Sequence, residues 1–560
     1  METPQPSTAD SAYQHQTHPS IELVHLCLSE HATSQTLDEE VPMHPLRADT
    51  TGPSDDLLHR SRSSTLQKSS GLSRGLTSQN TTRPLNPPAS HIPSGTQRVQ
   101  GSNSIRVGIT EAPSSHGESQ SRLAQKLTLA RRVEKFWLHW STAYRLIIAY
   151  TVLVNGCLIV YIMNRHRTPS NLLIATSTNL LVAVAIRQED LINAIFTFFA
   201  KTPSTWPLGL RKVIADVHHY GGLHIGCAVS ALFWYIAFVA DSTVKIVHHQ
   251  HSSTMTPWLW GSIVTSYAFM VCLVAVCITA HPRLRAKFHN TFEHTHRFGG
   301  WLALVVLWIN SGVASHDPAN TTRLYKTAPL WLLLTTTCLV ILPWLRIRRV
   351  PITTQLVSAR EVKITFPYAN MPYTSTVKFS RSPLDEWHAF ATTPSPDTTS
   401  ATIIVSQAGD WTRTIINAPP PTLWMRNPPT QNFLALTPLF SSLLLVATGA
   451  GIGPVLSLLT SPTIRRMRDA GRLVKVLWTV YAPEAEHWRF VQDIIRAVDP
   501  EPVIYDSRQA RPDVAFEAKY LASTREIEAV MVVSNPGVTA AVVRGVKAQG
   551  GCAYGAVFDS

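Results

Sequence analysis

The sequence has few cysteines, and they form no pattern typical of a disulfide framework or a zinc site. Its 560 residues contain seven cysteines and no Cys-x-x-Cys pair. Five lie within apolar stretches: Cys157, Cys227, Cys272, Cys277 and Cys338. Cysteines in such surroundings behave as small buried hydrophobic residues. The sequence therefore supports neither a disulfide-stapled fold nor a cysteine zinc centre.

Acidic residues are also scarce, with 36 Asp and Glu against 49 Lys and Arg, which gives a net charge of +13. The sequence lacks a nucleic-acid-binding motif and a basic patch interleaved with aromatic residues. Its basic residues cluster beside apolar stretches instead. This distribution indicates a lipid bilayer as the partner rather than nucleic acid.

Residues 1–125 lack any sustained hydrophobic periodicity and are rich in Ser, Thr, Pro, Gln and His. Such a segment buries too little apolar surface to offset the entropy lost on ordering. We expect a disordered, cytosolic tail.

Six apolar stretches follow, most of them close to the roughly 20 residues that cross a hydrocarbon core. They cover residues 143–163, 171–199, 221–240, 258–280, 299–315 and 328–345. We predict a six-helix transmembrane domain over residues 135–346, with the fifth helix extending backward through His296. The charged "RQED" of Arg187–Asp190 interrupts the second stretch and lies either at the membrane edge, which we favour, or in an ion pair inside the bundle.

The basic residues predict the orientation of these spans. Arg and Lys are concentrated in the segments before the first span, between the second and third, between the fourth and fifth, and after the sixth. The positive-inside rule then places both termini in the cytosol. The sequence predicts a multi-pass integral membrane protein without identifying the membrane.

Two soluble domains are expected after Arg349. Residues 350–432 contain short alternating runs such as "REVKITF" and "STVKFS" between Pro- and Ser-rich turns, which predicts an antiparallel β-barrel. In residues 435–560, apolar strands such as "SLLLVAT" and "EAVMVVS" alternate with helix-like segments. That alternation predicts an α/β doubly wound parallel sheet.

A glycine-rich turn follows the first strand of the predicted parallel sheet. In "LLLVATGAGIGPVLSLL", Gly449, Gly451 and Gly453 precede Pro454 and a helix. Glycines let backbone amides approach a pyrophosphate, and a helix N-terminus favours negative charge. Because proline stands where the Rossmann fingerprint has its last glycine, the turn differs from that motif.

The order of these parts and several short motifs carry a resemblance. A barrel, a G-x-G-x-G-P turn and a doubly wound sheet resemble the ferredoxin–NADP reductase superfamily, and preceding spans resemble the ferric reductase and NADPH oxidase group. The motifs that are most similar to those of fungal TmpA-type transmembrane flavoproteins are "EWHAFA", "GDWTR", "TLWMR", "ATGAGIGP" and "VVSNP". The resemblance covers about residues 130–560.

This resemblance implies FAD in the barrel. "EWHAFATTP" is similar to the group's His-Pro-Phe-Thr flavin motif, with His388 and Phe390 retained and Ala389 and Ala391 in place of proline and threonine. "AGDWTRTI" is similar to the next motif of that group, the segment that contacts the flavin diphosphate. Its implied contacts are Gly409, Asp410, Trp411 and Thr412.

The resemblance also implies a nicotinamide dinucleotide on the parallel sheet. Ser534 and Asn535 match a Cys-Gly-Pro motif of ferric reductases but lack its cysteine, and Phe558 matches an aromatic residue over the flavin ring. From the residues themselves, Arg508 and Arg511 after a strand suit a 2′-phosphate, since arginine forks bind phosphate. We expect NADPH rather than NADH, although Asp506 would repel that phosphate if it pointed inward.

Two histidine-glycine signatures, "HHYGG" and "HRFGG", open two of the apolar stretches. In ferric reductases two helices each carry two histidines at fourteen-residue spacing, and facing pairs hold two haems. Fourteen positions turn a helix by about 1,400° and rise about 21 Å. Counted from His296, that position is Asn310, and counted from His218 it is Leu232.

An outer haem therefore has no ligands in this register. One inner haem b between His218 (or His219) and His296 stays open, against the alternative that the glycines serve helix packing. His224 is a weaker candidate ligand.

The sequence thus predicts a membrane-bound oxidoreductase that passes electrons from NAD(P)H through FAD to an unidentified acceptor. The resemblance to TmpA-type proteins implies a role in fungal signalling, development or secondary metabolism. Two alternatives remain: a ferric reductase or superoxide-producing oxidase with haem, and a non-catalytic receptor or scaffold on the same fold.

Overall fold

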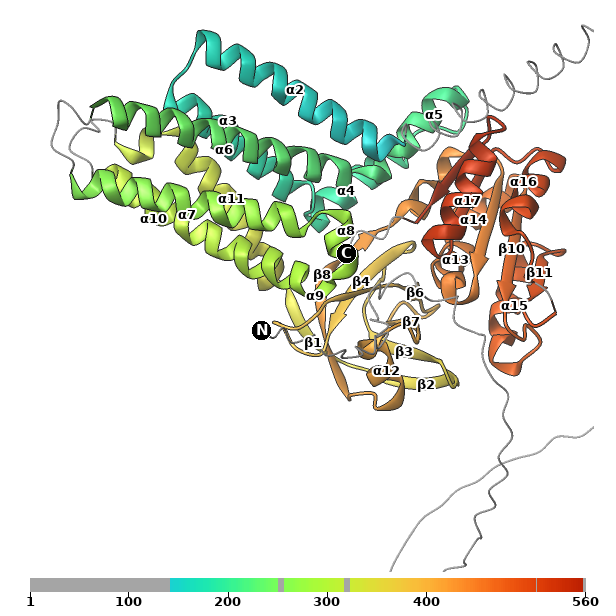
Figure 1. Ribbon diagram of the computed structural model, residues 1–560. Helices are drawn as coiled ribbons and strands as arrows, with labels where there is room; N and C mark the ends of the chain where they lie inside the picture. Colours follow the sequence, from blue (N-terminus) through green and yellow to red (C-terminus); the bar gives the residue numbers. More distant parts are fainter. Residues whose placement is uncertain (1–141, 250–255, 317–322, 510, 557–560) are drawn as a thin grey trace, which may run out of the picture. The chain divides into compact units, whose positions relative to one another are not determined.

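The computed structural model describes residues 142–249, 256–316, 323–509 and 511–556 (Figure 1). The predicted disordered tail of residues 1–125 lies outside this range, and so does Phe558. The six cysteines that the structure describes are all free thiols.

Among the described residues, helices make up most of the chain from Ala143 to Leu345. They are α2 (Ala143–Arg165), α3 (Pro169–Ala185), α4 (Glu189–Phe199), α5 (Leu208–Ala215), η1 (Asp216–His219), α6 (Gly221–His249), α7 (Pro257–Thr279), α8 (Pro282–Lys287), α9 (His289–His294), η2 (Thr295–Gly299), α10 (Gly300–Ser315), η3 (Leu324–Lys326) and α11 (Ala328–Leu345). Among the described residues, five helical segments are long and apolar enough to cross a membrane, and a sixth counts only if a bent pair is taken as one span.

The bent pair corrects the predicted second span. Residues 171–199 form two helices, α3 and α4, whose axes differ by 71° across a break at residues 186–188. The apolar face of α4 packs through Ile192 and Phe196 into the core of the C-terminal sheet. The sequence misled here because a membrane span and an amphipathic helix on a soluble core share the same apolar periodicity.

The predicted fifth span extends backward as expected. The helical run of residues 289–315 passes through a π-helical turn at Thr295–Gly299, which contains His296. Such turns are rare and occur frequently at functional sites.

Close packing of α2 against α6 depends on two glycines of α6. A Cβ atom added at Gly222 would lie 2.6 Å from the carbonyl oxygen of Tyr144, and one at Gly226 would lie 2.7 Å from Cβ of Thr151. Glycine therefore lets the two helix backbones approach, as at small-residue helix interfaces in membranes. Of the glycines in the two signatures, Gly222 thus serves helix packing, whereas a Cβ atom at Gly300 would meet no atom within 4 Å.

Two four-stranded antiparallel sheets follow the last apolar helix. Their strands are β1 (Ile347–Pro351), β2 (Thr353–Ser358), β3 (Glu361–Pro367), β4 (Ser375–Ser380), β5 (His388–Ala391), β6 (Thr393–Pro394), β7 (Ser400–Ser406) and β8 (Thr422–Gln431), with helix α12 (Asp410–Asn417) before β8. The strand orders are β1-β8-β4-β5 and β2-β3-β7-β6. Both sheets and α12 share one buried core.

The C-terminal part is a five-stranded parallel sheet with helices on both faces. Its elements are η4 (Phe433–Leu439), β9 (Leu443–Thr448), η5 (Gly449–Gly451), α13 (Ile452–Leu459), α14 (Pro462–Asp469), β10 (Val474–Val480), η6 (Glu486–Trp488), α15 (Arg489–Val498), β11 (Val503–Asp506), α16 (Val514–Thr524), β12 (Ala529–Val533), α17 (Pro536–Lys547) and β13 (Cys552–Gly555). The order β11-β10-β9-β12-β13, all parallel, confirms the doubly wound prediction.

Alternate residues of the central strand β9 face the two sides of this sheet. Leu443 and Leu445 pack with α13, α14 and α15, whereas Leu444 and Val446 pack with α16 and α17. All four side chains are fully buried. A parallel strand covered on both faces reads as a continuous apolar run, as "LLLV" does.

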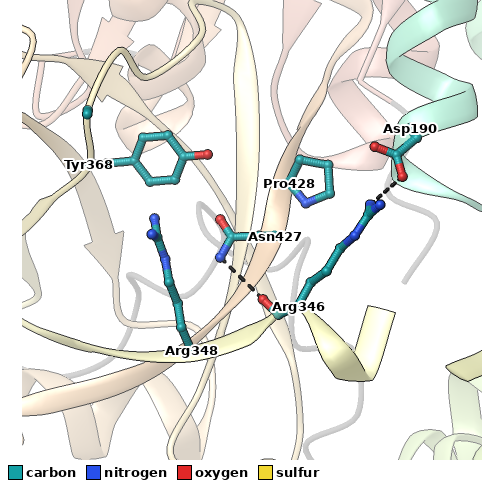
Figure 2. A pocket seen from close by; sticks show the side chains of 7 residues that line it. Asp190, Arg346, Arg348, Tyr368, Asn427 and Pro428 are labelled. Carbon is teal, nitrogen blue, oxygen red and sulfur yellow. Dashed lines mark hydrogen bonds and ion pairs between the residues drawn. The ribbon is translucent and has the colours of Figure 1, made fainter. Parts of the chain in front are cut away.

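The junction between the last apolar helix and the first strand is held by polar contacts (Figure 2). Arg346 forms an ion pair with Asp190 at the start of α4, and its carbonyl oxygen accepts from Asn427 Nδ2 at 3.3 Å. The guanidinium of Arg348 lies 4.9 Å from the ring centre of Tyr368. The two carboxylates of "RQED" thus pair with cations outside the apolar helices, Asp190 with Arg346 and Glu189 with Arg426.

A buried arginine joins the connector α5 to the parallel sheet. Arg211 Nη1 and Nη2 donate to the two carboxylate oxygens of Glu528 at 2.8 and 3.2 Å. Arg211 also donates to the carbonyl oxygens of Trp206 and Leu439, both at 2.7 Å. Its side chain is 6% exposed, and its planar guanidinium binds both oxygens of one carboxylate.

Replacing Arg211 by Gln should lower the stability of the whole protein. Removing one partner of a buried pair leaves the Glu528 carboxylate without its charge partner, a loss of about 3 kcal/mol. Thermal unfolding of the detergent-purified protein measures it, with Arg413→Gln as control because Arg413 forms only an exposed pair with Asp410. Equal melting temperatures for the two variants would contradict this assignment.

Candidate flavin and dinucleotide site

One cavity of about 770 Å³ connects the apolar helices with both β-containing parts. Its helical side is lined by residues of α3, α6, α7, α10 and α11, including Tyr235, Phe269 and Leu333. On the antiparallel sheets it is lined by Thr376, Lys378, His388, Ala389, Ala391 and Arg426. Pro454 and Val533 line it at the parallel sheet. Residues predicted for flavin and dinucleotide therefore meet at one cavity.

His388 begins β5 and lies at the cavity wall. Its ring packs on Trp411 with 4.5 Å between ring centres, and Phe390 stacks on the same indole at 5.6 Å. The two motifs predicted to contact flavin are thus in direct contact with each other. His388 Nε2 is buried without a hydrogen bond to any described residue, although a Glu386 carboxylate oxygen lies 3.3 Å away. Phe390 faces the sheet core rather than the cavity.

The segment Gly409–Thr412 forms the N-terminus of α12. Thr412 Oγ1 accepts from the backbone amides of Ala408 and Gly409 at 2.8 and 2.9 Å. Its hydroxyl therefore stabilises its own turn. Trp411 is buried beneath His388, and Asp410 is exposed. Of the four predicted contacts, the structure connects only Trp411 with the cavity wall, through His388.

Two cations face each other across the strands at this wall. Lys378 of β4 is the register partner of Arg426 of β8. Like charges directly opposite on neighbouring strands repel each other. Glu189 from the start of α4 lies between them, 3.0 Å from Arg426 Nε and 4.0 Å from Lys378 Nζ. Burial and the Arg426 guanidinium lower the pKa of Lys378 to about 8.

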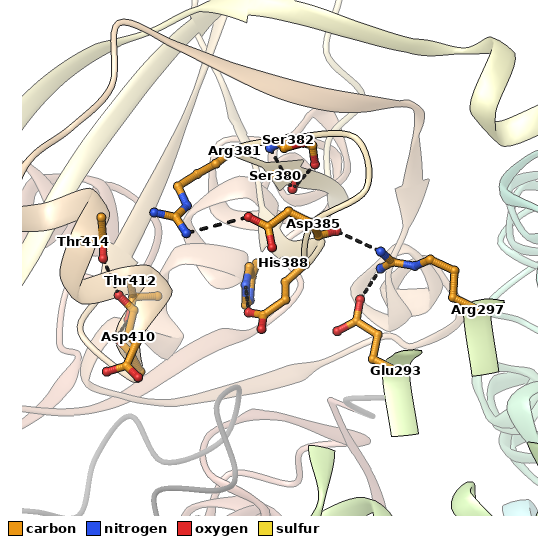
Figure 3. A network of polar contacts seen from close by, with 12 residues as sticks. Glu293, Arg297, Ser380, Arg381, Ser382, Asp385, His388, Asp410, Thr412 and Thr414 are labelled. Carbon is orange, nitrogen blue, oxygen red and sulfur yellow. Dashed lines mark hydrogen bonds and ion pairs between the residues drawn. The ribbon is translucent and has the colours of Figure 1, made fainter. Parts of the chain in front are cut away.

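The residue after His296 holds the loop that leads into β5 (Figure 3). Arg297 donates to the carbonyl oxygens of Leu384 and Asp385 at 2.8 and 3.1 Å and forms an ion pair with Glu293. The π-helical turn and the flavin-motif strand are therefore coupled through one guanidinium.

The glycine turn lies at the carboxyl end of the central strand. Gly449 has a φ of +50°, and its carbonyl oxygen accepts from Trp478 Nε1 at 3.1 Å. A Cβ atom at Gly451 would lie 2.5 Å from the carbonyl oxygen of Val533, whereas one at Gly453 would meet no atom within 4 Å. Gly451 is thus required by the close approach of β12, and Gly453 leaves space beside the helix start.

Ser534 and Asn535 follow the neighbouring strand β12. Ser534 is buried, and its hydroxyl shares a hydrogen bond of 2.7 Å with Thr448, the last residue of β9. Asn535 caps α17, because its Oδ1 accepts from the amide of Val538 at 3.0 Å. The carboxyl ends of β9 and β12 are therefore linked, which is where doubly wound sheets bind ligands.

Arg508 and Arg511 lie after β11, in an exposed loop. Arg508 pairs with Asp506 and Glu484 and lies 5.7 Å from the ring centre of Tyr481. Hydrogen bonds from Arg508 lower the pKa of Asp506 to about 2. Asp506 is thus neutralised by the arginine that we expected to bind a 2′-phosphate.

The histidines are arranged differently from the predicted haem pair. The ring of His296 faces His224, with 6.2 Å between ring centres and an angle of 64°. His224 Nδ1 contacts the carbonyl oxygen of Ala183 at 2.8 Å, and His296 Nδ1 is buried without a hydrogen-bond partner in the described chain. The ring neighbours of His218 are His219, Phe433 and Tyr554. The facing pair on the helices is therefore His224 with His296, and the haem itself remains a prediction.

At the depth in the helices where an outer haem would lie, aromatic and polar side chains pack against one another. Tyr235 and Phe269 pack edge to face at 4.6 Å, and Asn310 Nδ2 donates to Ser266 Oγ at 2.7 Å. Leu232 and Phe238 pack on the same cluster. These contacts agree with the absence of ligands one haem spacing further along the helices.

Sequence reasoning did not identify Lys378, Arg426 and Glu189 as a group. The alternation of β4 was nevertheless visible: Val377 and Phe379 are buried in the core, so Lys378 had to face the other side. Its pairing with Arg426 depends on strand register, and the position of Glu189 depends on the bend before α4.

The strand orders and the glycine turn define a ferredoxin–NADP reductase-like module behind a set of apolar helices. Residues 433–560 match the family model described as "Adenylate-forming reductase 03009, C-terminal domain". Two curated relatives from Coprinopsis cinerea, the adenylate-forming reductases 03009 and 06235, are each 35% identical to this chain, over 427 and 432 residues.

Each of these alignments covers 74% of this chain and 40% of the relative. The chain therefore spans 40% of the length of these curated relatives. The alignments are longer than the two β-containing parts together, so the similarity extends into the apolar helices.

Two solved structures resemble parts of the chain. A ferredoxin NADP⁺ reductase from Neisseria gonorrhoeae, with bound FAD and NADP, is 15% identical and covers 38% of this chain and 98% of its own, with a TM-score of 0.31. A flavohemoglobin from Malassezia yamatoensis, with bound FAD and heme, is 12% identical and covers 74% of this chain and 98% of its own, with a TM-score of 0.34. At these scores neither likeness bears on the chemistry of this chain.

Exchanging Gly451 for Ala should destabilise the parallel sheet. The new Cβ would overlap the Val533 carbonyl, and such overpacking costs about 1–3 kcal/mol. Gly453→Ala is the matched control for stability, because its Cβ meets open space and alanine favours a helix. Thermal unfolding compares the two, and a Gly451→Ala protein as stable as Gly453→Ala would refute the close approach of β12.

Proposed function

We propose that this protein is an NAD(P)H-dependent, FAD-containing oxidoreductase bound to a membrane. The observation that carries the proposal is the single cavity shared by His388, Pro454 and the interior of the apolar helices. The names of the relatives, both adenylate-forming reductases, support a reductase activity.

The residues at the cavity fit FAD. The only charged neighbour of the buried Nε2 of His388 among the described residues is a Glu386 carboxylate oxygen at 3.3 Å. Four cations line the cavity against two carboxylates, Glu189 and Glu293; the cations are Arg187, Arg297, Lys378 and Arg426. A diphosphate would balance this positive charge through charge-assisted hydrogen bonds. Ala389 and Ala391 leave room at the strand where the resembled family has larger residues.

FAD bound here would accept two electrons as hydride from the nicotinamide and release them singly or together. The chain's own residues bind and orient the two cofactors. Pro454 and Val533 lie on the dinucleotide side of the cavity and Ala391 on the flavin side, so this arrangement brings the two rings to one water-poor space. We favour NADPH, because Arg508 and Arg511 flank the loop after β11.

The apolar helices support a multi-pass membrane location with both termini in the cytosol. Five helices meet the length and hydropathy of a span, and a sixth span is reached only if α3 and α4, bent by 71°, are taken as one. This arrangement agrees with a TmpA-type transmembrane flavoprotein and with a role in fungal signalling, development or secondary metabolism.

The electron acceptor in this proposal is a small molecule dissolved in the membrane. The cavity continues from the flavin wall past His296 to Phe269 and Leu333 between the helices. An apolar molecule could therefore reach the flavin side from within the bilayer. Delivery to ferric iron or oxygen outside would need a second haem, for which the described helices offer no ligand pair.

Removing the imidazole of His388 should lower flavin occupancy. A His388→Ala protein loses one hydrogen-bond donor to the cofactor, which corresponds to about tenfold weaker FAD binding. The ratio of flavin absorbance to protein absorbance in detergent-purified protein measures occupancy, with His487→Ala as a control outside the cavity.

The same spectrum distinguishes the alternatives. Flavin bands that bleach on addition of NADPH support the proposal. A Soret band that is present in the wild type and lost in His296→Ala would show that a haem is also bound, with His296 as a ligand. A colourless protein that cannot be reconstituted with FAD would refute the proposal and favour a receptor or scaffold.

Filling the cavity between the helices should separate the two half-reactions. Ala303 is 7% exposed and lines the cavity, whereas Val305 on the same helix is 54% exposed. In Ala303→Trp we expect an about tenfold higher KM for a short-chain benzoquinone and unchanged NADPH:ferricyanide turnover, because a bulky ring blocks the apolar approach only. Val305→Trp is the control. Equal quinone kinetics in both variants would exclude this route.

A further inference from the structure

Three polar side chains meet at the turn before α6, and none of them has a role in the flavin site proposed above, although His218 also lines the cavity. Asp216, His218 and His219 each offer a potential ligand atom, and these atoms lie within 4.8 Å of one another. In the described chain, Asp216 Oδ1, His218 Nε2 and His219 Nδ1 are buried and make no hydrogen bond. Buried polar atoms without partners are rare, and three at one turn indicate a missing ligand.

His218 has the orientation of a metal-binding histidine. Its Nδ1 contacts the carbonyl oxygen of Ala215 at 2.7 Å, which leaves the lone pair on Nε2. Histidine ligands of metals typically donate their other ring nitrogen to such a carbonyl. The side chain is 6% exposed.

Asp216 and His219 supply the remaining donors. His219 Nε2 lies 4.0 Å from Asp216 Oδ1, and the two histidine rings are 3.8 Å apart at 38°. Two donors of one ion at about 2.1 Å lie at most about 4.2 Å apart, so binding draws this turn slightly together.

One cation already approaches the cluster. Lys547 Nζ of α17 lies 3.9 Å from Asp216 Oδ1, and its side chain is 34% exposed. At that distance the ammonium partly compensates the carboxylate but leaves both histidine nitrogens without a partner. Lys547 therefore competes with a metal ion for Asp216.

We propose that Asp216, His218 and His219 bind one first-row divalent cation, such as Zn²⁺ or Fe²⁺. Two imidazoles with one carboxylate are a donor set for these ions, and a three-residue site leaves coordination positions open. The site joins the connector before α6 to the parallel sheet, because His218 also packs on Tyr554 of β13 at 5.7 Å between ring centres.

The test uses the full-length protein in detergent. After removal of metal by a chelator, Co²⁺ is titrated and followed by its visible absorbance, and the protein as purified is analysed for Zn, Fe, Mn and Cu. We expect one ion per chain. Second-sphere substitutions at metal sites cost about 10–100-fold in affinity, so loss of a ligand in His219→Ala should exceed about 100-fold.

Lys547→Met separates a metal site from a simple ion pair. If a cation binds here, removing the competing ammonium tightens Co²⁺ binding by about tenfold or more, since like charges at this distance repel strongly. Lys519→Met, at a partly exposed lysine on α16, is the control and should leave binding unchanged. Unfolding temperature, read in parallel, verifies that each variant folds.

Two results would overturn the site. Folded wild-type protein that binds no Co²⁺ and contains no metal would show that Lys547 alone serves Asp216. Co²⁺ binding that is unchanged in both His219→Ala and Lys547→Met would place the ion elsewhere. Neither result depends on flavin binding or NAD(P)H oxidation, so the outcome is independent of the proposed function.

Discussion

The forked contact of Arg211 with Glu528 is the constraint on which the other sites depend. Glu528 immediately precedes β12, and its carboxylate also accepts from the amide of Ser441, just before β9. One buried guanidinium thus fixes the starts of two neighbouring parallel strands to the connector between the apolar helices. The turn with Asp216 and His218 follows this connector directly, so its position against β13 depends on the same contact. The cavity wall formed by α4 and α6 depends on it as well.

At the cavity, the repulsion between two cations of one sheet is relieved by a carboxylate from a helix. Lys378 and Arg426 face each other on neighbouring strands of one sheet, where like charges repel each other. Glu189 reaches them only because the chain bends before α4. The bend therefore has an electrostatic reason as well as an apolar one. A single carboxylate between two cations leaves positive charge, which suits an anionic cofactor.

Much of the fold was predictable because its signals are local. "STVKFS" is β4 residue for residue, and "SLLLVAT" and "LVKVLWTV" match β9 and β10 within one residue. The glycine turn was found for the same reason. The second apolar stretch was predicted as one helix, but it bends into two. Its composition cannot distinguish a membrane span from a helix packed on a soluble core. The partner of His296 also differed, because Ala183 and Arg297 fix the two rings through contacts distant in sequence.

The sequence by itself determined the elements: which segments are apolar helices, which are strands, and where a dinucleotide turn interrupts them. These follow from periodicity and from glycine, which act over a few residues. Only the tertiary structure decided which side chains meet. His388 at the cavity wall, Glu189 between two cations, and Asp216 beside Lys547 all depend on strand register, the bend before α4 and the packing of distant segments. Such contacts are set by packing between distant segments, and no local pattern records them.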